Sequence, residues 1–153
     1  MFSKDTDDPS NVQLISTGHA ASNRVTEPAV FNNSTVDIEV LNSLEDAEDT
    51  TVKTFDYAHL SLGASVSFEN IRVSSVYTTS NEELASYGAM TLTCRQFAEA
   101  IDVRTVVLYD ENDEMITAEA YEGKTINVRG IVDYYQGKYQ IKVFSKDDIT
   151  VLD

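Results

Sequence analysis

The sequence predicts an all-β fold built around a small closed barrel of five strands, and three observations predict it. Residues 121–144 alternate apolar and polar side chains with period 2 through a hairpin, and residues 148–152 read as a closing strand. Gly130 falls on the inward face of this hairpin, where a small barrel turns a corner without a β-carbon. The alternation changes phase at residues 69–70, which predicts a bulge in a long first strand. A slip of one residue in pairing would expose the apolar face, so the register is well specified.

The length and charge of the chain limit what it can be. Its 153 residues support one core of ordinary size rather than two independent domains. It has 11 Lys and Arg against 26 Asp and Glu, a net charge of −15 at pH 7. Such a charge repels nucleic acid and anionic membranes at long range. A polyanionic partner therefore needs a local basic patch.

Targeting signals and cysteine content give further expectations. No apolar run reaches the length of a membrane-spanning helix, so we expect no membrane insertion. Residues 1–5 lack the regions of a signal peptide, so a secreted parent protein would have lost its signal or carry it upstream. Cys94 is the one cysteine, which excludes an internal disulfide and a multi-cysteine zinc site. Its strand position predicts an inert, buried thiol.

Residues 1–59 form a predicted N-terminal extension, and residues 60–153 form the predicted barrel. Residues 1–33 are rich in Ser, Thr, Asn and Asp, which predicts disorder or a loosely packed arm. Residues 34–40 alternate as a strand does, residues 52–55 read as a second strand, and the acidic residues between them predict one helical turn or a loop. We expect the extension to add one or two strands or to lie across the barrel.

The barrel region divides into three strands, a short helix or loop, and two further strands. The alternation of Met90, Leu92 and Cys94 with polar neighbours places these three side chains inside. Helix-forming residues stand between the third and fourth strands, and Gly123 ends that stretch. In order, the expected elements are a strand at 64–73, a loop at 78–88, strands at 90–95 and 101–109, a helix or loop at 115–121, and the closing hairpin.

This order, together with residues 123–135 running into residues 137–143, resembles the OB-fold. The resemblance is closest to the OB-type modules attached to secreted bacterial nucleases and other multidomain cell-surface proteins. It covers residues 60–152 and leaves the first third of the chain unexplained. It implies an extracellular or cell-surface location and a binding role, and OB-folds bind single strands, oligosaccharides or other proteins.

The resemblance also implies a place for the binding site. OB-folds bind on the outer face of the second and third strands, between the loop joining strands one and two and the loop joining strands four and five. Here the second of these loops, Gln136-Gly137, is too short to wrap around a strand. The residues implied are Arg72, Tyr77, Tyr87, Thr91, Thr93, Arg95 and Arg104, flanked by Arg129, Tyr135, Lys138 and Lys142 from the last hairpin.

Two interpretations of these residues compete. Arginines and tyrosines on one sheet face can pair with phosphates and stack on bases, each stack contributing about 1 to 3 kcal/mol. Charged residues also alternate on any solvated strand face, where they discourage edge-to-edge aggregation. Several of the few basic residues fall on the same predicted face, which favours the first interpretation.

No metal site, cofactor site or catalytic site is expected. Asp110, Asn112 and Glu114 place oxygen ligands at alternate positions, as calcium loops do. Met115 stands where such a loop needs glycine, and Tyr121 stands where it needs glutamate, so an acidic hairpin turn is expected instead. The two histidines have no partner at zinc-ligand spacing. The sequence contains no nucleophile elbow, P-loop or dinucleotide fingerprint, so we do not expect an enzyme.

The leading functional prediction is a non-catalytic accessory module of a secreted bacterial protein that holds single-stranded nucleic acid near a nuclease domain. The alternative is a structural or protein-interaction module that packs against a neighbouring domain and binds no nucleic acid. A third prediction is oligosaccharide binding on the same face, with Tyr77 and Tyr87 as platforms for sugar rings.

Overall fold

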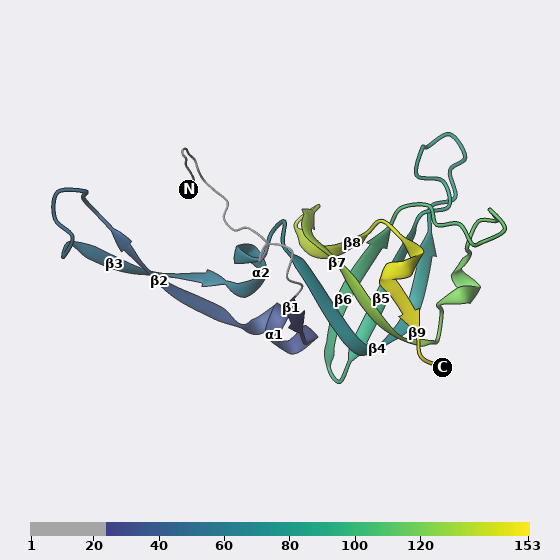
Figure 1. Ribbon diagram of the computed structural model, residues 1–153, viewed down its shortest axis with the longest axis horizontal. Coiled ribbons are helices and arrows are strands. Elements are labelled where there is room, and N and C mark those ends of the chain that lie inside the picture. Colours follow the sequence, from purple (N-terminus) through teal and green to yellow (C-terminus); the bar gives the residue numbers. More distant parts are fainter. Residues whose placement is uncertain (1–23) are drawn as a thin grey trace.

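The computed structural model describes residues 24–153, which form a mostly β structure (Figure 1). The prediction of disorder for residues 1–23 lies outside the described residues. For residues 24–33 the prediction of a loosely packed arm is wrong, because they form strand β1 (Arg24–Thr26) and helix α1 (Pro28–Asn33). None of the helices in residues 24–153 is long and apolar enough to cross a membrane.

Five strands of the main sheet close into a ring. The sheet has the order β1-β4-β5-β6-β8-β7-β9, and a further pairing of β4 with β7 joins its first and last ring strands. Strand β1 extends the sheet beside β4, and β9 (Ile149–Val151) extends it beside β7. The predicted mostly β fold is therefore confirmed, with one sheet that closes on itself. The ring strands are β4 (Ser65–Thr78), β5 (Met90–Gln96), β6 (Glu99–Thr105), β7 (Thr125–Tyr135) and β8 (Lys138–Val143).

Strand β4 carries the predicted bulge. Its pairing with β7 shifts register between Phe68 and Ile71, and Asn70 has a left-handed φ of 57°. From Phe68 to Ile71 the chain advances three residues on β4, against two from Val128 to Ile126 on β7, so one residue is inserted. The insertion lets Phe68 and Ile71 both point into the core, which strict alternation would not allow. The bend lets β4 pair with β7 through its first half and with β5 through its second half.

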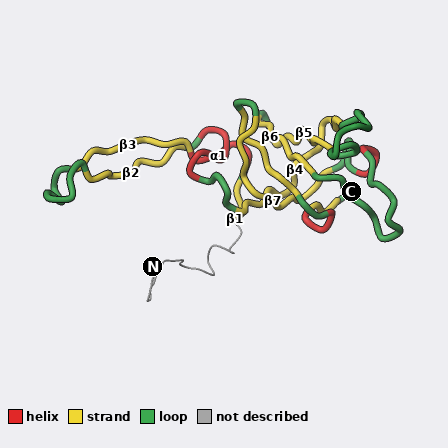
Figure 2. Tube along the Cα trace, turned by 90° about the horizontal axis from the view of Figure 1, so that it is seen from above, coloured by secondary structure: helices red, strands yellow, loops and turns green. Residues whose placement is uncertain are grey.

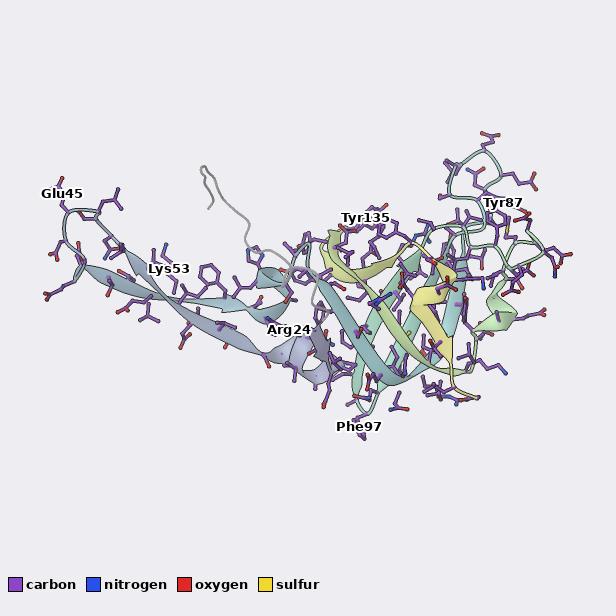
Figure 3. All side chains as sticks on the ribbon, in the orientation of Figure 1. Arg24, Glu45, Lys53, Tyr87, Phe97 and Tyr135 are labelled. Carbon is purple, nitrogen blue, oxygen red and sulfur yellow. The ribbon has the colours of Figure 1, made fainter. Side chains whose placement is uncertain are left out.

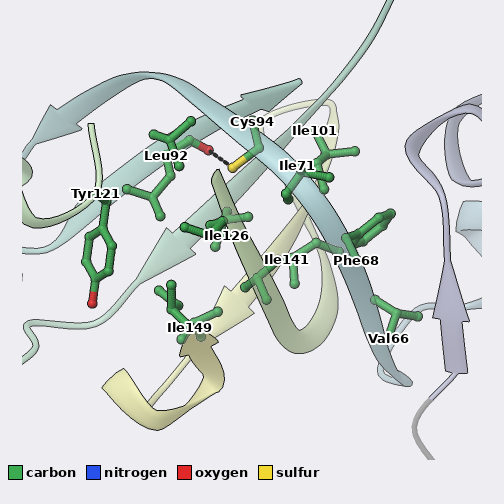
Figure 4. Close-up of a cluster of buried hydrophobic side chains, with 14 of the residues drawn as sticks. Val66, Phe68, Ile71, Leu92, Cys94, Ile101, Tyr121, Ile126, Ile141 and Ile149 are labelled. Atoms are coloured by element: carbon green, nitrogen blue, oxygen red, sulfur yellow. Dashed lines mark hydrogen bonds between the residues drawn. The ribbon is translucent and has the colours of Figure 1, made fainter. Parts of the chain in front are cut away.

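The interior of the ring is filled by alternate side chains from all five strands (Figure 4). Leu92, Cys94 and Ile126 are fully buried, as the period-2 pattern predicted. Burial is the main cause that raises the pKa of the Cys94 thiol to about 12, with the charge of Asp102 as a smaller one. The thiol is therefore protonated and enclosed, which confirms the predicted core position.

Gly130 lies where strands β7 and β8 approach most closely. A β-carbon on this residue would lie 2.5 Å from the carbonyl oxygen of Lys142 and 2.6 Å from Cγ2 of Ile141. The carbonyl belongs to the backbone, so it could move only with its strand. The predicted need for a residue without a side chain is confirmed at this position.

Helix α1 supplies a core residue from outside the predicted barrel region. The ring centroid of Phe31 lies 5.7 Å from that of Phe68, 6.3 Å from that of Tyr57 and 6.4 Å from that of Tyr139, all edge to face. Figure 4 shows Phe68 and Tyr121 at opposite ends of the buried cluster. Tyr121 follows η2 (Ala118–Ala120), a single 3₁₀ turn that occupies the place of the predicted short helix. Phe31 therefore covers the end of the core at Phe68.

The remaining strands form an arm that projects from the ring (Figures 1 and 2). Strands β2 (Thr35–Leu41) and β3 (Thr50–Asp56) pair only with each other, as a separate antiparallel sheet. The acidic residues between them form a loop, and helix α2 (Tyr57–Leu60) connects β3 to the ring. The extension thus contributes three strands, of which β1 joins the ring sheet and β2 and β3 do not. We call β2, β3 and their connecting loop the arm.

Candidate binding groove

A row of outward side chains crosses four strands of the ring. The pairing registers place Tyr77 opposite Thr91, Thr91 opposite Arg104, and Arg104 beside Lys142. Because neighbouring residues in a register lie about 5 Å apart on one face, these four side chains form a continuous line from β4 to β8. The predicted site residues Tyr77, Thr91 and Arg104 are therefore adjacent.

This row lines a hollow of about 650 Å³. The loop between β4 and β5 contributes Thr79, the end of β7 contributes Tyr135, and the turn between β7 and β8 contributes Gln136. That turn has left-handed φ at both Gln136 and Gly137, 51° and 81°, the conformation of a tight two-residue hairpin. The short loop does not wrap around a strand, but it still forms one wall of the hollow.

A second hollow of about 450 Å³ continues the first. It is lined by Thr93 and Arg95 from β5, and it shares Asp102, Lys138 and Tyr139 with the first hollow. The shared residues place the two hollows side by side, as adjoining parts of one depression over the outer face of β5, β6 and β8. We call this depression the groove.

Arg104 is the most distinctive side chain in the groove. It is half-buried, and its guanidinium donates from Nη1 to Oγ1 of Thr91 at 3.1 Å and from Nη2 to Oγ1 of Thr79 at 3.0 Å. Among residues 24–153, no carboxylate forms an ion pair with it. The hydroxyl groups fix the orientation of the guanidinium without neutralising its charge. The groove thereby holds an oriented cation that has no ion-pair partner within residues 24–153.

The charge of Lys138 is compensated, in contrast to that of Arg104. Its Nζ lies 3.0 Å from Oδ2 of Asp102, and Oδ1 of Asp102 accepts a hydrogen bond from Oγ1 of Thr93 at 3.1 Å. Lys142 has its Nζ 5.9 Å from the ring centroid of Phe144, a contact that leaves its charge in place. The cations of the groove that no carboxylate of the described chain pairs with are Arg95, Arg104 and Lys142.

Arg72 and Arg95 lie opposite each other on β4 and β5. Both side chains are exposed, and like charges in this position repel each other. Arg95 lines the groove, whereas Arg72 lies beside its end and does not line it. The pair forms a small positive surface beside the end of the groove.

Two predicted site residues lie away from the groove. Arg129 donates from Nε and Nη2 to Oδ1 of Asp148, at 3.1 and 2.8 Å, and it lines a separate hollow of about 260 Å³. Tyr87 is exposed in the loop between β4 and β5, and it does not line the groove. Figure 3 shows Tyr87 and Tyr135 well apart at the same end of the ring. The outer surface of the ring is curved, so the part of β7 that carries Arg129 faces another direction from the outer faces of β5 and β6.

Two residues that shape the groove have no signal in the sequence. Thr79 lies 25 residues from Arg104 in the chain, and no local pattern links them. Asn32 comes from α1, donates to the carbonyl of Ala100 at 2.8 Å and to Oε1 of Glu99 at 3.0 Å, and lines the end of the groove. Hydrogen bonds from Asn32 and then Asn33 lower the pKa of the Glu99 carboxyl. The helix that closes the core therefore also borders the groove.

The acidic loop after β6 has the structure of a tight turn. Oδ1 of Asp110 accepts hydrogen bonds from the amides of Asn112 at 2.8 Å and Glu114 at 3.0 Å. Tyr109 and Met115 then pair across the turn. In the part of the chain that the structure describes, no three His, Cys, Asp or Glu side chains gather as a metal ion would require.

No protein-family model matches this sequence, and no curated protein matches it as a relative. The chemistry of the groove is therefore the basis for assigning a function. An oriented guanidinium suits an anionic oxygen, and exposed phenol rings suit flat ring systems. Both groups lie along one depression across the sheet.

Proposed function

We propose that this chain is a non-catalytic OB-fold module of a secreted bacterial protein, and that its groove holds single-stranded nucleic acid beside a nuclease domain. The order of pairing in the ring supports the fold. Counted along the chain, the first ring strand, β4, pairs with the second, β5, and the fourth, β7, and the third, β6, pairs in parallel with the fifth, β8. This order of pairing is the one expected of a Greek-key barrel of the OB type. The resemblance of residues 123–143 to nuclease-associated modules supports the location and the neighbouring domain.

The observation that carries the ligand assignment is the state of Arg104. Its charge is half-buried and oriented by two threonine hydroxyls, and no carboxylate within residues 24–153 pairs with it. Partial burial strengthens its attraction for an anion, because water screens it less than it screens an exposed cation. A phosphodiester oxygen is a ligand that a guanidinium binds well.

Exposed tyrosines at both sides of the groove support a nucleotide ligand over an isolated anion. Tyr77 is 64% exposed and Tyr135 is 58% exposed, and both line the groove. Stacking of a base on such a ring contributes about 1 to 3 kcal/mol and tolerates any base. Flexible single strands can present phosphates to Arg104 and bases to the tyrosines, whereas a rigid duplex keeps its bases stacked inside.

The balance of charges limits the affinity. The chain carries a net charge of −15, and three cations of the groove that no carboxylate of residues 24–153 pairs with, Arg95, Arg104 and Lys142, oppose this locally. Release of counterions from about three phosphates gives a slope of log K against log salt of about −2 for a single strand. Binding should therefore be modest, and it should weaken measurably as salt is raised.

Fluorescence anisotropy with a labelled single-stranded oligonucleotide tests the proposal. We expect the double variant Arg95→Ala, Arg104→Ala to bind about tenfold more weakly or worse, with a shallower salt dependence. Arg129→Ala is the matched control, because it also removes a positive charge but lies in a separate hollow. Absence of binding by the unaltered protein at low salt would contradict the proposal, as would an equal loss in the Arg129→Ala variant.

The second candidate function is a structural or protein-interaction module. The projecting arm favours it, because its strands pair with nothing else in the described chain. The negative charge of the whole chain also favours it. Failure of the anisotropy experiment at low salt would make this the preferred function. Displacement of the oligonucleotide by a neutral oligosaccharide would instead assign the groove to sugar rings.

A further inference from the structure

The arm is exposed on both of its faces. Nearly every residue of β2 and β3 is exposed, and only the ends of the strands are half-buried. A two-stranded antiparallel sheet of this length is marginally stable alone in water. Strands gain stability when a third or fourth strand is added, or when a face is covered. The arm therefore has the form of half of a larger sheet.

The two faces of the arm differ in chemistry. The register places Val36 opposite Phe55 and Ile38 opposite Lys53, so one face is largely apolar. On the other face, Oγ1 of Thr54 donates to Asp37 at 2.6 Å and Oγ1 of Thr50 donates to Glu39 at 2.9 Å. Asp37 and Glu39 lie in the middle of β2, whereas the one acidic residue of β3, Asp56, lies at the end of its strand next to the ring.

The hydrogen bonds at the two ends of the arm show which backbone groups reach its free edge. The amide of Asn42 donates to the carbonyl of Asp49 at 2.8 Å, and the amide of Tyr57 donates to the carbonyl of Ser34 at 2.9 Å. The backbone groups of a strand point alternately to its two sides. Val52 and Thr54 therefore direct their amides and carbonyls away from β2, toward the free edge of β3, and Thr50 directs its carbonyl there. The amide of Thr50 donates to the carbonyl of Glu48 at 3.1 Å.

The free edges of β2 and β3 differ in how well each can pair with the same edge of a second copy of the chain. Two-fold pairing of β2 with its copy would set Asp37 and Glu39 of one chain against the same acids of the other, and like charges in opposite positions destabilise a sheet. Strand β3 has the sequence Thr-Thr-Val-Lys-Thr-Phe-Asp, whose first six residues hold one charge and favour extended structure. The acids thus protect the edge of β2 and leave the edge of β3 open.

We propose that β3 pairs antiparallel with β3 of a second copy of this chain, across a two-fold axis at Thr51. In this register Lys53 of each chain lies opposite Asp49 of the other, so the contact contains two pairs of opposite charges. The arms become one four-stranded sheet with the apolar side chains of both copies on the same face. Since each copy uses the same edge, the contact closes as a dimer and does not propagate into a fibre.

The long-range charge of the chains works against this contact and gives it a characteristic salt dependence. Each copy carries a net charge of −15, so the two copies repel each other beyond the contact itself. Salt screens this repulsion. Dimerisation should therefore strengthen as salt is raised, which is opposite to the behaviour expected for nucleic acid in the groove. Failure of either proposal thus leaves the other intact.

Sedimentation equilibrium of the full chain over a concentration series up to about 1 mM tests the dimer, because contacts this small are weak. Val52→Pro removes an amide that faces the free edge and is not used within the arm, and we expect this variant to be monomeric. Val52→Thr, which keeps the amide and the branched side chain, is its control and should dimerise as the unaltered chain does. Dimerisation of the proline variant would overturn the proposal, as would a monomeric unaltered chain.

A charge exchange tests the register and does not depend on the proline variant remaining folded. Lys53→Glu places two like-charged pairs in the contact and should weaken the dimer by about tenfold. Adding Asp49→Lys restores opposite charges in the reversed order, and the dimer should recover. No recovery in the double variant would overturn the proposed register. Protection of the Val52 amide from hydrogen exchange in a monomer would assign the edge to another segment of the chain and overturn the dimer.

Discussion

The ring and the arm are built from strands of similar pattern, yet they bury their side chains to very different degrees. Ile126 of the ring is fully buried, whereas Ile38 of the arm is 37% exposed, although both stand at apolar positions of alternating strands. The ring closes on itself, so each inward face meets another inward face. The arm has no second layer within residues 24–153. Alternation thus specifies that a face is apolar, and the topology decides whether anything covers it.

The largest expected effect concerns the covering of the ring by the N-terminal segment. Phe31→Ala should lower the free energy of unfolding by about 3 to 5 kcal/mol, because it removes a buried aromatic ring and leaves a cavity. Urea denaturation measures the loss. Val30→Ala on the same helix is the control, since Val30 is 39% exposed. Equal effects of the two substitutions would show that α1 does not close the core.

A pair of identical substitutions compares the two regions directly. Ile126→Ala in the ring should lower the free energy of unfolding by about 2 to 5 kcal/mol. Ile38→Ala in the arm should lower it by about 1 kcal/mol or less when measured on the monomer, because Ile38 is 37% exposed and no second layer within residues 24–153 covers its face. Denaturation of both variants at low protein concentration gives the difference. A large loss for Ile38→Ala would mean that the arm is covered in solution.

Close approach of β7 and β8 predicts a smaller loss at Gly130. Gly130→Ala forces the backbone of β8 away from β7 and should cost about 1 to 3 kcal/mol of stability. The loss should appear in the same denaturation experiment. An unchanged midpoint would show that the two strands can separate without strain.

The smallest expected effect is a pH dependence from Cys94. Its folded pKa of about 12 lies above the ordinary value of 9.0, so the folded protein keeps a proton that the unfolded chain loses between these values. Stability from this group is fully present below pH 9 and declines as the pH rises toward 12. We expect a loss of about 1 kcal/mol at pH 10, which Cys94→Val should not show. An equal decline in both proteins would assign it to other groups.

Local patterns in the sequence predicted the ring well. Met90, Leu92 and Cys94 alternate with polar neighbours, and Gly130 interrupts an apolar face, so short stretches specify both features. The bulge in β4 follows from a change of phase between neighbouring residues. Each of these signals lies within about ten residues of chain, the range in which periodicity can be recognised.

Features that depend on distant contacts could not be predicted. Phe31 stands in a polar segment, and its burial depends on rings contributed by Phe68 and Tyr139. In the candidate site, the row from Tyr77 to Arg104 follows from alternation and register. The placement of Arg129 in another hollow depends on the curvature of the ring, and the bond from Arg104 to Thr79 depends on a loop. Such contacts have no local sequence signal.

We propose that the groove over β5, β6 and β8 binds single-stranded nucleic acid. Backbone amide shifts recorded by NMR, during titration with a short single-stranded oligonucleotide at low salt, test it most directly. We predict shifts along the row from Thr91 to Arg104 and Lys142, and none at Arg129 or in the arm. Unchanged amides along that row, or shifts centred on Arg129 or the arm, would contradict the account.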